Sequence, residues 1–306
     1  MSWPNPSKQS SITKPEVKQN IIKTRVSAVA SIESYPCCTY VSMVTGIKEP
    51  VGISAYIGSA LHDVRYWFNK NVDEISKSLE AEDVYSIWDH LKRSYTKAGG
   101  EAINKQKARM KYDNVEFEPA DMVHFESVIY EDVLRQAANT SMNLRMNRKY
   151  YESYQHPKLL LLEGNDSKTL LAKKVIDGVT VEVTAHQDVA IWIPISSVWC
   201  AYDYKTGRPT PIDQWIEPYH LQQLNGYSWI IVTLGLGKCP IGVVIFTQES
   251  DMFSHRYVPL NPDNFEKLLR ILVGWSKGER PDWTPCTRAK YCSEEKRLAC
   301  KQIFGW

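Results

Sequence analysis

The sequence contains no long hydrophobic run, no glycine-rich nucleotide-binding motif and no strong charge of either sign. No window of the 306 residues approaches the roughly 20 apolar residues that a membrane span needs. Neither GxGxxG nor GxxxxGK(S/T) occurs, which excludes the dinucleotide-binding and P-loop patterns. The net charge is only +2, so overall charge does not indicate a nucleic-acid-binding protein. The function must therefore be sought in local motifs, and we expect no membrane contact.

Residues 1–24 lack apolar periodicity and are rich in Ser, Pro, Lys and Asn, which predicts a flexible tail. This segment also lacks the apolar core of a secretory signal, so we expect an intracellular, cytoplasmic protein. Seven cysteines are present, an odd number, and without a secretory signal a disulfide framework is not expected. The thiols are therefore core residues, free thiols or metal ligands.

Residues 25–306 are expected to form one domain with a helical first half. Apolar residues recur at helical spacing in 59–70, in about 72–97 and in the long stretch around 120–150. Three β-prone runs follow between 170 and 205, and turn-like residues separate them. The three runs are typical of an antiparallel meander.

The last third of the sequence alternates helix and strand signals. A helix is predicted around Leu221 and Tyr227, and strands are predicted near 229–234, 240–247 and 255–259. Asn261-Pro262 then opens a helix that closes near Gly278. The whole pattern indicates an α/β (α+β) fold, with a mixed central sheet that is flanked by helices.

The segment "DYKTG" carries an acid and an amine two residues apart on a predicted strand. Asp203 and Lys205 therefore project from the same face. An acid in such a position can ligate a divalent cation, while an ammonium group can orient water or stabilise charge at a phosphorus centre. When the pair is considered alone, a cross-strand or surface salt bridge at the end of a strand is the commoner explanation.

Four further residues gain significance from their spacing relative to this pair. Asp188 lies in the preceding β-prone run, where it could face Asp203 across a hairpin and share a hard cation. His62 follows a glycine in a predicted helix, in "GSALH". Gln223 and Tyr227, in "QLNGY", share one helix face. An exposed strand acid, a hydrogen-bonded helix histidine and simple packing are the alternative explanations.

Taken in order, "GSALH", an acid, "DYKTG" and "QLNGY" resemble the RecB-like branch of the PD-(D/E)XK nucleases. The resemblance extends from about residue 31 to residue 300. It implies a restriction-endonuclease-like fold, in which helices flank a mixed central sheet.

The resemblance also implies a role for each motif residue. His62, the acids Asp188 and Asp203, and the peptide carbonyl of Tyr204 would hold Mg²⁺ or Mn²⁺. Lys205 would position or activate the attacking water. Gln223 and Tyr227 would support the lysine and the DNA. One departure is His186, which stands where family members often have a glycine two residues before the first acid.

One subset of this family binds a 4Fe-4S cluster through one early cysteine and three late ones. The resemblance therefore implies a cluster that Cys37, or its neighbour Cys38, would share with Cys286, Cys292 and Cys300. Five and seven residues separate the three late cysteines, whereas the family tends to have two and about five. A Zn²⁺ site and a set of unligated thiols are the alternatives.

The function that the resemblance implies is a metal-dependent DNA nuclease. It would be an exonuclease that hydrolyses phosphodiester bonds in single-stranded or free-ended DNA, during repair, recombination, phage replication or CRISPR adaptation. Because the sequence contains no helicase motor, the resemblance also implies a helicase or recombination partner. Two alternatives stay open: a non-catalytic DNA-binding or structural subunit of the same fold, and a zinc-stapled hydrolase of another class.

Overall fold

The computed structural model describes most of the chain. The described stretches are residues 21–47, 52–79, 84–153, 170–185, 189–193, 196–205, 216–246, 255–283 and 292–305.

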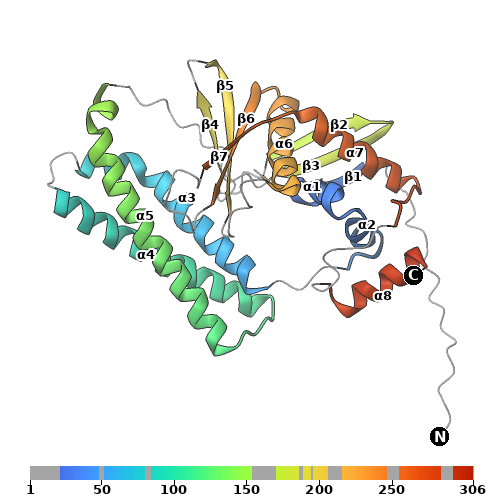
Figure 1. Cartoon of the computed structure of the whole chain (residues 1–306), viewed down its shortest axis with the longest axis horizontal. Coiled ribbons are helices and arrows are strands. Elements are labelled where there is room, and N and C mark those ends of the chain that lie inside the picture. Colours follow the sequence, from blue (N-terminus) through green and yellow to red (C-terminus); the bar gives the residue numbers. More distant parts are fainter. Residues whose placement is uncertain are drawn as a thin grey trace, which may run out of the picture.

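Within these stretches the chain forms eight helices and seven strands (Figure 1). The strands are β1 (Ile21–Arg25), β2 (Leu170–Ile176), β3 (Val179–Ala185), β4 (Val189–Ile193), β5 (Val198–Lys205), β6 (Lys238–Phe246) and β7 (His255–Pro259). The helices are α1 (Val26–Ser34), α2 (Pro36–Thr45), α3 (Ile53–Leu79), α4 (Val84–Tyr112), α5 (Pro119–Ser153), α6 (Pro218–Thr233), α7 (Pro262–Ser276) and α8 (Glu294–Phe304). The described residues thus form a mixed α/β protein of the α+β kind.

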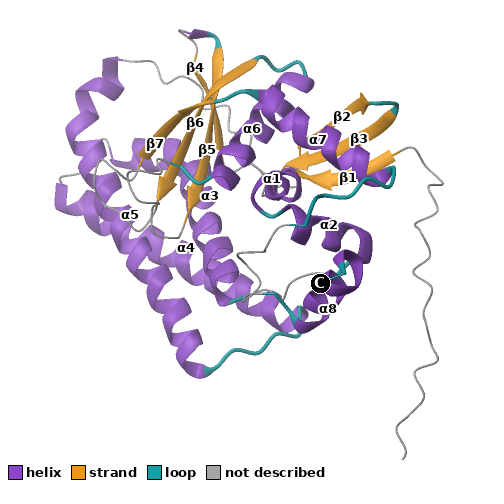
Figure 2. Ribbon diagram, turned by 45° about the vertical axis from the view of Figure 1, so that its right-hand side comes forward, coloured by secondary structure: helices purple, strands orange, loops and turns teal. Residues whose placement is uncertain are grey.

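The described strands form two small mixed sheets (Figure 2). One sheet has the order β1-β3-β2, in which β1 and β3 are parallel and β2 and β3 are antiparallel. The other has the order β4-β5-β6-β7, in which only β5 and β6 are parallel. The parallel pair requires a crossover connection, and α6 lies in that connection.

Helix α6 is the central helix of the fold. Its residues 222–231 are all buried, as expected for a helix that is covered on every side. The helix packs against α1, α7 and strands of both sheets. A Cβ atom at Gly226 would lie 2.6 Å from Val26 of α1 and 2.7 Å from Phe265 of α7, so only glycine allows this close approach.

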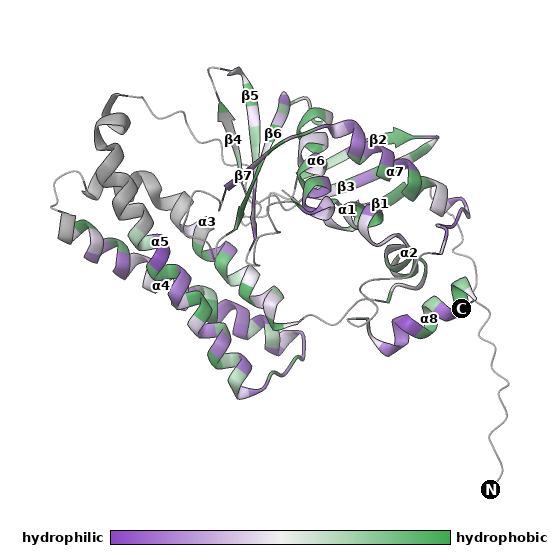
Figure 3. Cartoon of the chain, in the orientation of Figure 1, coloured by the Kyte–Doolittle hydropathy of each residue, from purple (hydrophilic) through white to green (hydrophobic). Residues whose placement is uncertain are grey.

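Helices α3, α4 and α5 form a helical unit with its own core, which includes Tyr56, Leu91, Phe125 and Ile129. Hydrophobic and hydrophilic residues alternate along α4 and α5, as expected for helices that each bury one stripe (Figure 3). None of the described helices is long and apolar enough to cross a membrane.

The structure confirms the mixed α and β character and the helix-rich first half, but it differs from the sequence prediction in detail. The predicted tail runs to residue 24, whereas residues 21–24 belong to β1, which pairs with β3. The predicted strand near 229–234 is wrong, because residues 229–233 continue α6. The β-branched residues of this run favour a strand, but Trp229, Ile230 and Ile231 are buried as part of the enclosed stretch of α6. The predicted meander is also divided, since β2 and β3 belong to one sheet and β4 and β5 to the other.

Candidate functional site

The end of β5 brings together the acid and the amine of "DYK". Half of the eight residues of β5 are aromatic or β-branched, and such residues favour extended structure. The Asp203 side chain is only 4% exposed, and its Oδ2 atom lies 2.7 Å from Lys205 Nζ. The Lys205 side chain is 19% exposed, so its ammonium group is the part of the pair that borders solvent. The expected shared face is thereby confirmed.

A second contact joins this pair to α6. Lys205 Nζ donates a hydrogen bond of 2.8 Å to Oε1 of Gln223, a residue 18 positions later in the chain. Tyr227 lies one helical turn beyond Gln223 and is also buried. The structure therefore brings Asp203, Lys205 and Gln223 into one connected cluster.

His220 adds a residue that the sequence interpretation missed. It precedes Gln223 by three positions, so both project from the same face of α6. Burial, and then the positive charge of Lys205, lowers the pKa of His220 to about 3, which keeps the imidazole neutral near pH 7. Its Nδ1 atom is buried and has no hydrogen-bond partner within the described part of the chain. The spacing to Gln223 was the sequence signal that could have identified it.

His62 approaches the same strand from the helical unit. Its ring centroid lies 6.2 Å from that of Tyr204, at an interplanar angle of 67°. The next residue, Asp63, accepts hydrogen bonds from Lys105 at 2.7 Å and from Gln106 at 2.9 Å, which fixes the rotation of α3 against α4. The helix histidine thus lies beside the residue that separates Asp203 from Lys205.

Asp188, the predicted first acid, lies outside the described residues. Strand β4 begins directly after it, and the first residue of that strand, Val189, pairs with Tyr202, the neighbour of Asp203. Among the described residues, no group of three or more His, Cys, Asp or Glu side chains is placed to hold a metal ion. The Asp203 carboxylate contacts Lys205 on one face of β5, whereas the His62 ring contacts Tyr204, which projects from the opposite face.

The early and late cysteines meet in space. The Sγ atoms of Cys38, in α2, and Cys292, just before α8, lie 3.6 Å apart although 254 positions separate them. Cys37 Sγ donates instead to the backbone oxygen of Asp282, also at 3.6 Å. The structure thus places Cys38, rather than Cys37, beside a late cysteine.

Of the two remaining late cysteines, the structure describes only Cys300. Cys300 is buried in a small cluster with Val41 and Ala299, where α8 packs on α2. Cys286 lies outside the described residues. Three of the candidate ligands, Cys38, Cys292 and Cys300, therefore lie where α2 meets α8 and the residues just before α8.

Cys200 and Cys239 are core residues, as the sequence predicts. Both are buried, on the neighbouring strands β5 and β6. Burial raises the pKa of the Cys200 thiol, and burial followed by the nearby Cys200 raises the pKa of Cys239 to about 12. Thiols in this state are poor nucleophiles and poor ligands.

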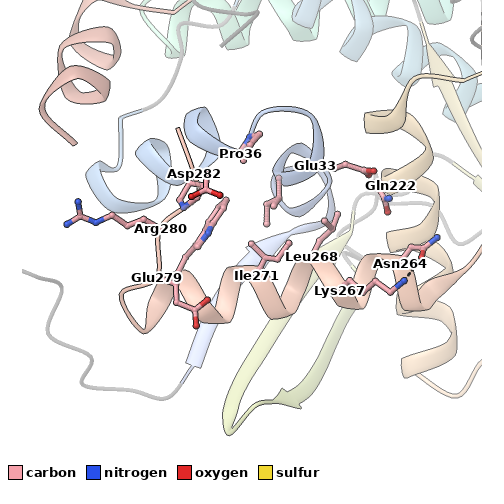
Figure 4. Close-up of a pocket in the computed structure, with 13 residues that line it drawn as sticks. Glu33, Pro36, Gln222, Asn264, Lys267, Leu268, Ile271, Glu279, Arg280 and Asp282 are labelled. Carbon is pink, nitrogen blue, oxygen red and sulfur yellow. Dashed lines mark hydrogen bonds between the residues drawn. The ribbon is translucent and has the colours of Figure 1, made fainter. Parts of the chain in front are cut away.

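A separate pocket of about 750 Å³ lies where α1, α7 and residues 279–282 meet (Figure 4). Glu33, Lys267, Glu279, Arg280 and Asp282 line it together with apolar residues. None of the residues in the Asp203, Lys205 and Gln223 cluster lines this pocket. This pocket and the residues with hydrolytic chemistry thus occupy different places.

A scan against protein-family models found no match for this chain, and neither did a search of curated proteins.

Proposed function

We propose that this protein is a metal-dependent DNA nuclease with a restriction-endonuclease-like fold of the PD-(D/E)XK type. The observation that supports this most strongly is the Lys205 ammonium group, which lies between the Asp203 carboxylate and the Gln223 amide. A lone salt bridge at a strand end would not require the helix residue. The strand–helix–strand arrangement of β5, α6 and β6 supports the fold assignment, because α6 carries both residues of "QLNGY" that the resemblance selects.

Asp203, Lys205 and Gln223 would each have a separate role in the reaction. Asp203 holds the Lys205 ammonium by charge, and Gln223 fixes its direction through a hydrogen bond. The ammonium then orients a water molecule or a phosphate oxygen and stabilises the negative charge that develops at phosphorus. Because Asp203 is nearly inaccessible, substrate meets the more exposed Lys205 first.

Mg²⁺ or Mn²⁺ would supply the Lewis acid in this mechanism, polarising the phosphate and lowering the pKa of a bound water. The donors present suit such an ion, since hard cations prefer carboxylate and carbonyl oxygens. Asp203 and the carbonyl of Tyr204 would provide the oxygens. The resemblance assigns a nitrogen ligand to His62, whose ring contacts the Tyr204 side chain on the other face of β5. Asp188 would add the second acid.

We further propose that the cysteines hold a metal centre that joins α2 to the region of α8. Cys38, Cys292, Cys300 and Cys286 would be the ligands. Two thiolates on one tetrahedral zinc lie about 3.8 Å apart, close to the separation of Cys38 and Cys292. Thiolates of a 4Fe-4S cluster bind different irons and lie farther apart. The contact therefore supports Zn²⁺ over the iron-sulfur cluster that the resemblance implies.

The nuclease proposal is tested by Lys205→Ala on labelled single-stranded and duplex DNA with free 5′ or free 3′ ends, in Mn²⁺ and in Mg²⁺. The parent should degrade DNA, and the variant should lose about 10²- to 10³-fold in rate. The matched control is Lys173→Ala, because Lys173 is also a strand lysine that pairs with an acid, Glu182, at 2.6 Å. The control should cleave as the parent does.

Two results would contradict the proposal in different ways. Equal cleavage by the parent and Lys205→Ala would remove Lys205 from the mechanism. DNA binding without cleavage, by the parent in either metal, would instead favour the non-catalytic subunit. The proposal also includes exonuclease polarity, a preference for unwound ends and a helicase or recombination partner. Comparing substrates that have a free 5′ end with those that have a free 3′ end measures the polarity, and comparing single-stranded with duplex DNA measures the preference for unwound ends.

A further inference from the structure

One face of α4 carries a hollow of about 710 Å³ that is lined by Asp89, Lys92, Arg93, Thr96 and Lys97. These residues recur at intervals of three or four positions, so they project from one side of the helix. All five are exposed to solvent. The α4 hollow therefore presents three cations and one carboxylate to any solute that approaches it.

The packing of the helical unit uses the other side of the same helical turns. Leu91 and Tyr95 are buried there, in the core that α4 shares with α3 and α5. The cations of the α4 hollow are consequently not needed to hold the helix in place, and their substitution should leave the fold intact.

Two lysines of the α4 hollow differ from the basic residues farther along the helix. Lys105, Lys107 and Arg109 each lie at ion-pair distance from an acidic side chain. Lys92 and Lys97 have no ion-pair or hydrogen-bond partner in the described part of the chain. Charges of one sign that are gathered on a surface without counter-charges attract ions of the opposite sign.

Arg93 is oriented by the backbone and keeps its charge available. Its Nε atom donates a hydrogen bond of 3.2 Å to the backbone oxygen of Asp89, and no acid among the described residues pairs with its guanidinium group. The planar guanidinium can thus donate to two oxygens of one phosphate. Asp89 supplies the one negative charge among the residues that line the α4 hollow.

The α4 hollow lies within reach of a strand that is held at Lys205. Gln106 of α4 donates to Asp63 of α3, which follows the histidine that contacts β5. Lys97 precedes Gln106 by nine positions and Asp89 precedes it by seventeen, or about 14–26 Å along the helix. Because phosphates follow one another about every 3.4 Å along a stacked strand, this length corresponds to about four to eight nucleotides.

We infer that the α4 hollow binds the phosphate backbone of the nucleic acid, about four to eight nucleotides away from the phosphate that Lys205 engages. This inference rests on the proposed nuclease function and assigns residues that no motif of the sequence selects. Contacts to phosphates read no base, so the α4 hollow contributes to the binding of every sequence alike.

The experiment measures the binding of a fluorescently labelled single strand of about 20 nucleotides, which spans both places, by anisotropy at several salt concentrations. Ca²⁺ replaces Mg²⁺ so that cleavage does not interfere. In Lys92→Gln/Lys97→Gln the affinity should fall about 3- to 10-fold, because two exposed charge pairs are lost. The slope of log K against log salt should decrease in magnitude by about 1.4, the value of two phosphate contacts on single strands.

Two further variants separate phosphate binding from a change in structure. Asp89→Asn removes the negative charge of the α4 hollow, so it should bind the strand about 2- to 3-fold more tightly. Lys267→Gln/Arg297→Gln is the matched control, because it removes two positive charges from exposed positions of α7 and α8. The control should leave both affinity and slope unchanged.

Cleavage in Mg²⁺ provides a second measurement. A contact that is remote from the reacting phosphate stabilises substrate and transition state equally, so Lys92→Gln/Lys97→Gln should raise KM and keep kcat. A lower kcat at unchanged KM would assign these lysines to the chemical step and would overturn the inference.

The possible failures are distinguishable. If the parent binds and cleaves DNA while Lys92→Gln/Lys97→Gln keeps both affinity and slope, the inference is wrong and the nuclease proposal stands. If the parent binds DNA without cleaving it, and the double variant binds more weakly, the inference stands and the nuclease proposal falls. If the parent does not bind DNA, or if polyglutamate displaces the labelled strand as effectively as unlabelled DNA does, the assignment to a nucleic acid is wrong.

Discussion

Lys205 and Gln223 are joined by a 2.8 Å hydrogen bond that connects the end of β5 to the second turn of α6. The bond holds an ammonium group in one direction, and a group that must meet a reacting phosphate depends on such positioning. The same contact joins the two motifs, "DYKTG" and "QLNGY", that the sequence pairs only by their order.

Gln223→Leu should lower the rate of DNA cleavage about 10- to 100-fold, as is typical when a supporting hydrogen bond to a site residue is removed. The matched control is Gln222→Leu, because Gln222 is an equally buried neighbour whose amide oxygen accepts a hydrogen bond from Asn225. The control should lose thermal stability but keep its cleavage rate. Similar cleavage by both variants would show that the bond to Lys205 has no catalytic role.

Cys38→Ser should lose bound metal, and Cys37→Ser should retain it, because only Cys38 lies against Cys292. Metal analysis after anaerobic purification tests this, and zinc without iron is the expected content. A chelator should lower the unfolding temperature of the parent and of Cys37→Ser, but should not lower that of Cys38→Ser further. Brown protein with absorption near about 400 nm would instead support the iron-sulfur cluster.

Gly226→Ala should destabilise the protein by about 1–3 kcal/mol, because the new methyl group would overlap Val26 and Phe265 in a closely packed core. Gly100→Ala should instead stabilise the protein. Gly100 lies within α4, and a Cβ atom there would meet nothing within 4 Å. That variant should gain up to about 1 kcal/mol from helix propensity. Urea unfolding followed by circular dichroism measures both, and destabilisation of equal size would contradict the packing explanation.

His220 should make the folded protein sensitive to acid. Its pKa is about 3 in the folded state and 6.5 by reference, so the unfolded chain takes up a proton first as the pH falls below 6.5. Stability is therefore lost on acidification, by about 2 kcal/mol at pH 5. His220→Gln should lose less stability between pH 7 and pH 5 than the parent does.

The control for this comparison is His124→Gln, since His124 is exposed on α5. Its loss of stability between the two pH values should match that of the parent. An identical pH dependence in His220→Gln and the parent would show that folding does not lower the pKa of His220.

The sequence alone predicted the elements whose signals are local. Strand β7 has the bounds that its alternating pattern predicts, and α7 begins where Asn261-Pro262 places it, with the Asn261 side chain accepting from the backbone of Asp263. The shared face of Asp203 and Lys205 also follows from the two-residue period of a strand. Such features depend only on residues a few positions apart in the chain, so the sequence by itself is enough to predict them.

The tertiary structure decided everything that depends on residues distant in the chain. Residues 229–231 complete the buried stretch of α6, and no local pattern reports that a helix is enclosed by other elements. Adjacent cysteines in α2 project in different directions, so helix rotation selects Cys38 rather than Cys37. Helix packing also pairs Lys105 of α4 with Asp63 of α3, 42 positions earlier in the chain. Strand pairing and helix packing depend on many residues that are distant in the chain, and for that reason the spacing of residues in the sequence does not predict them.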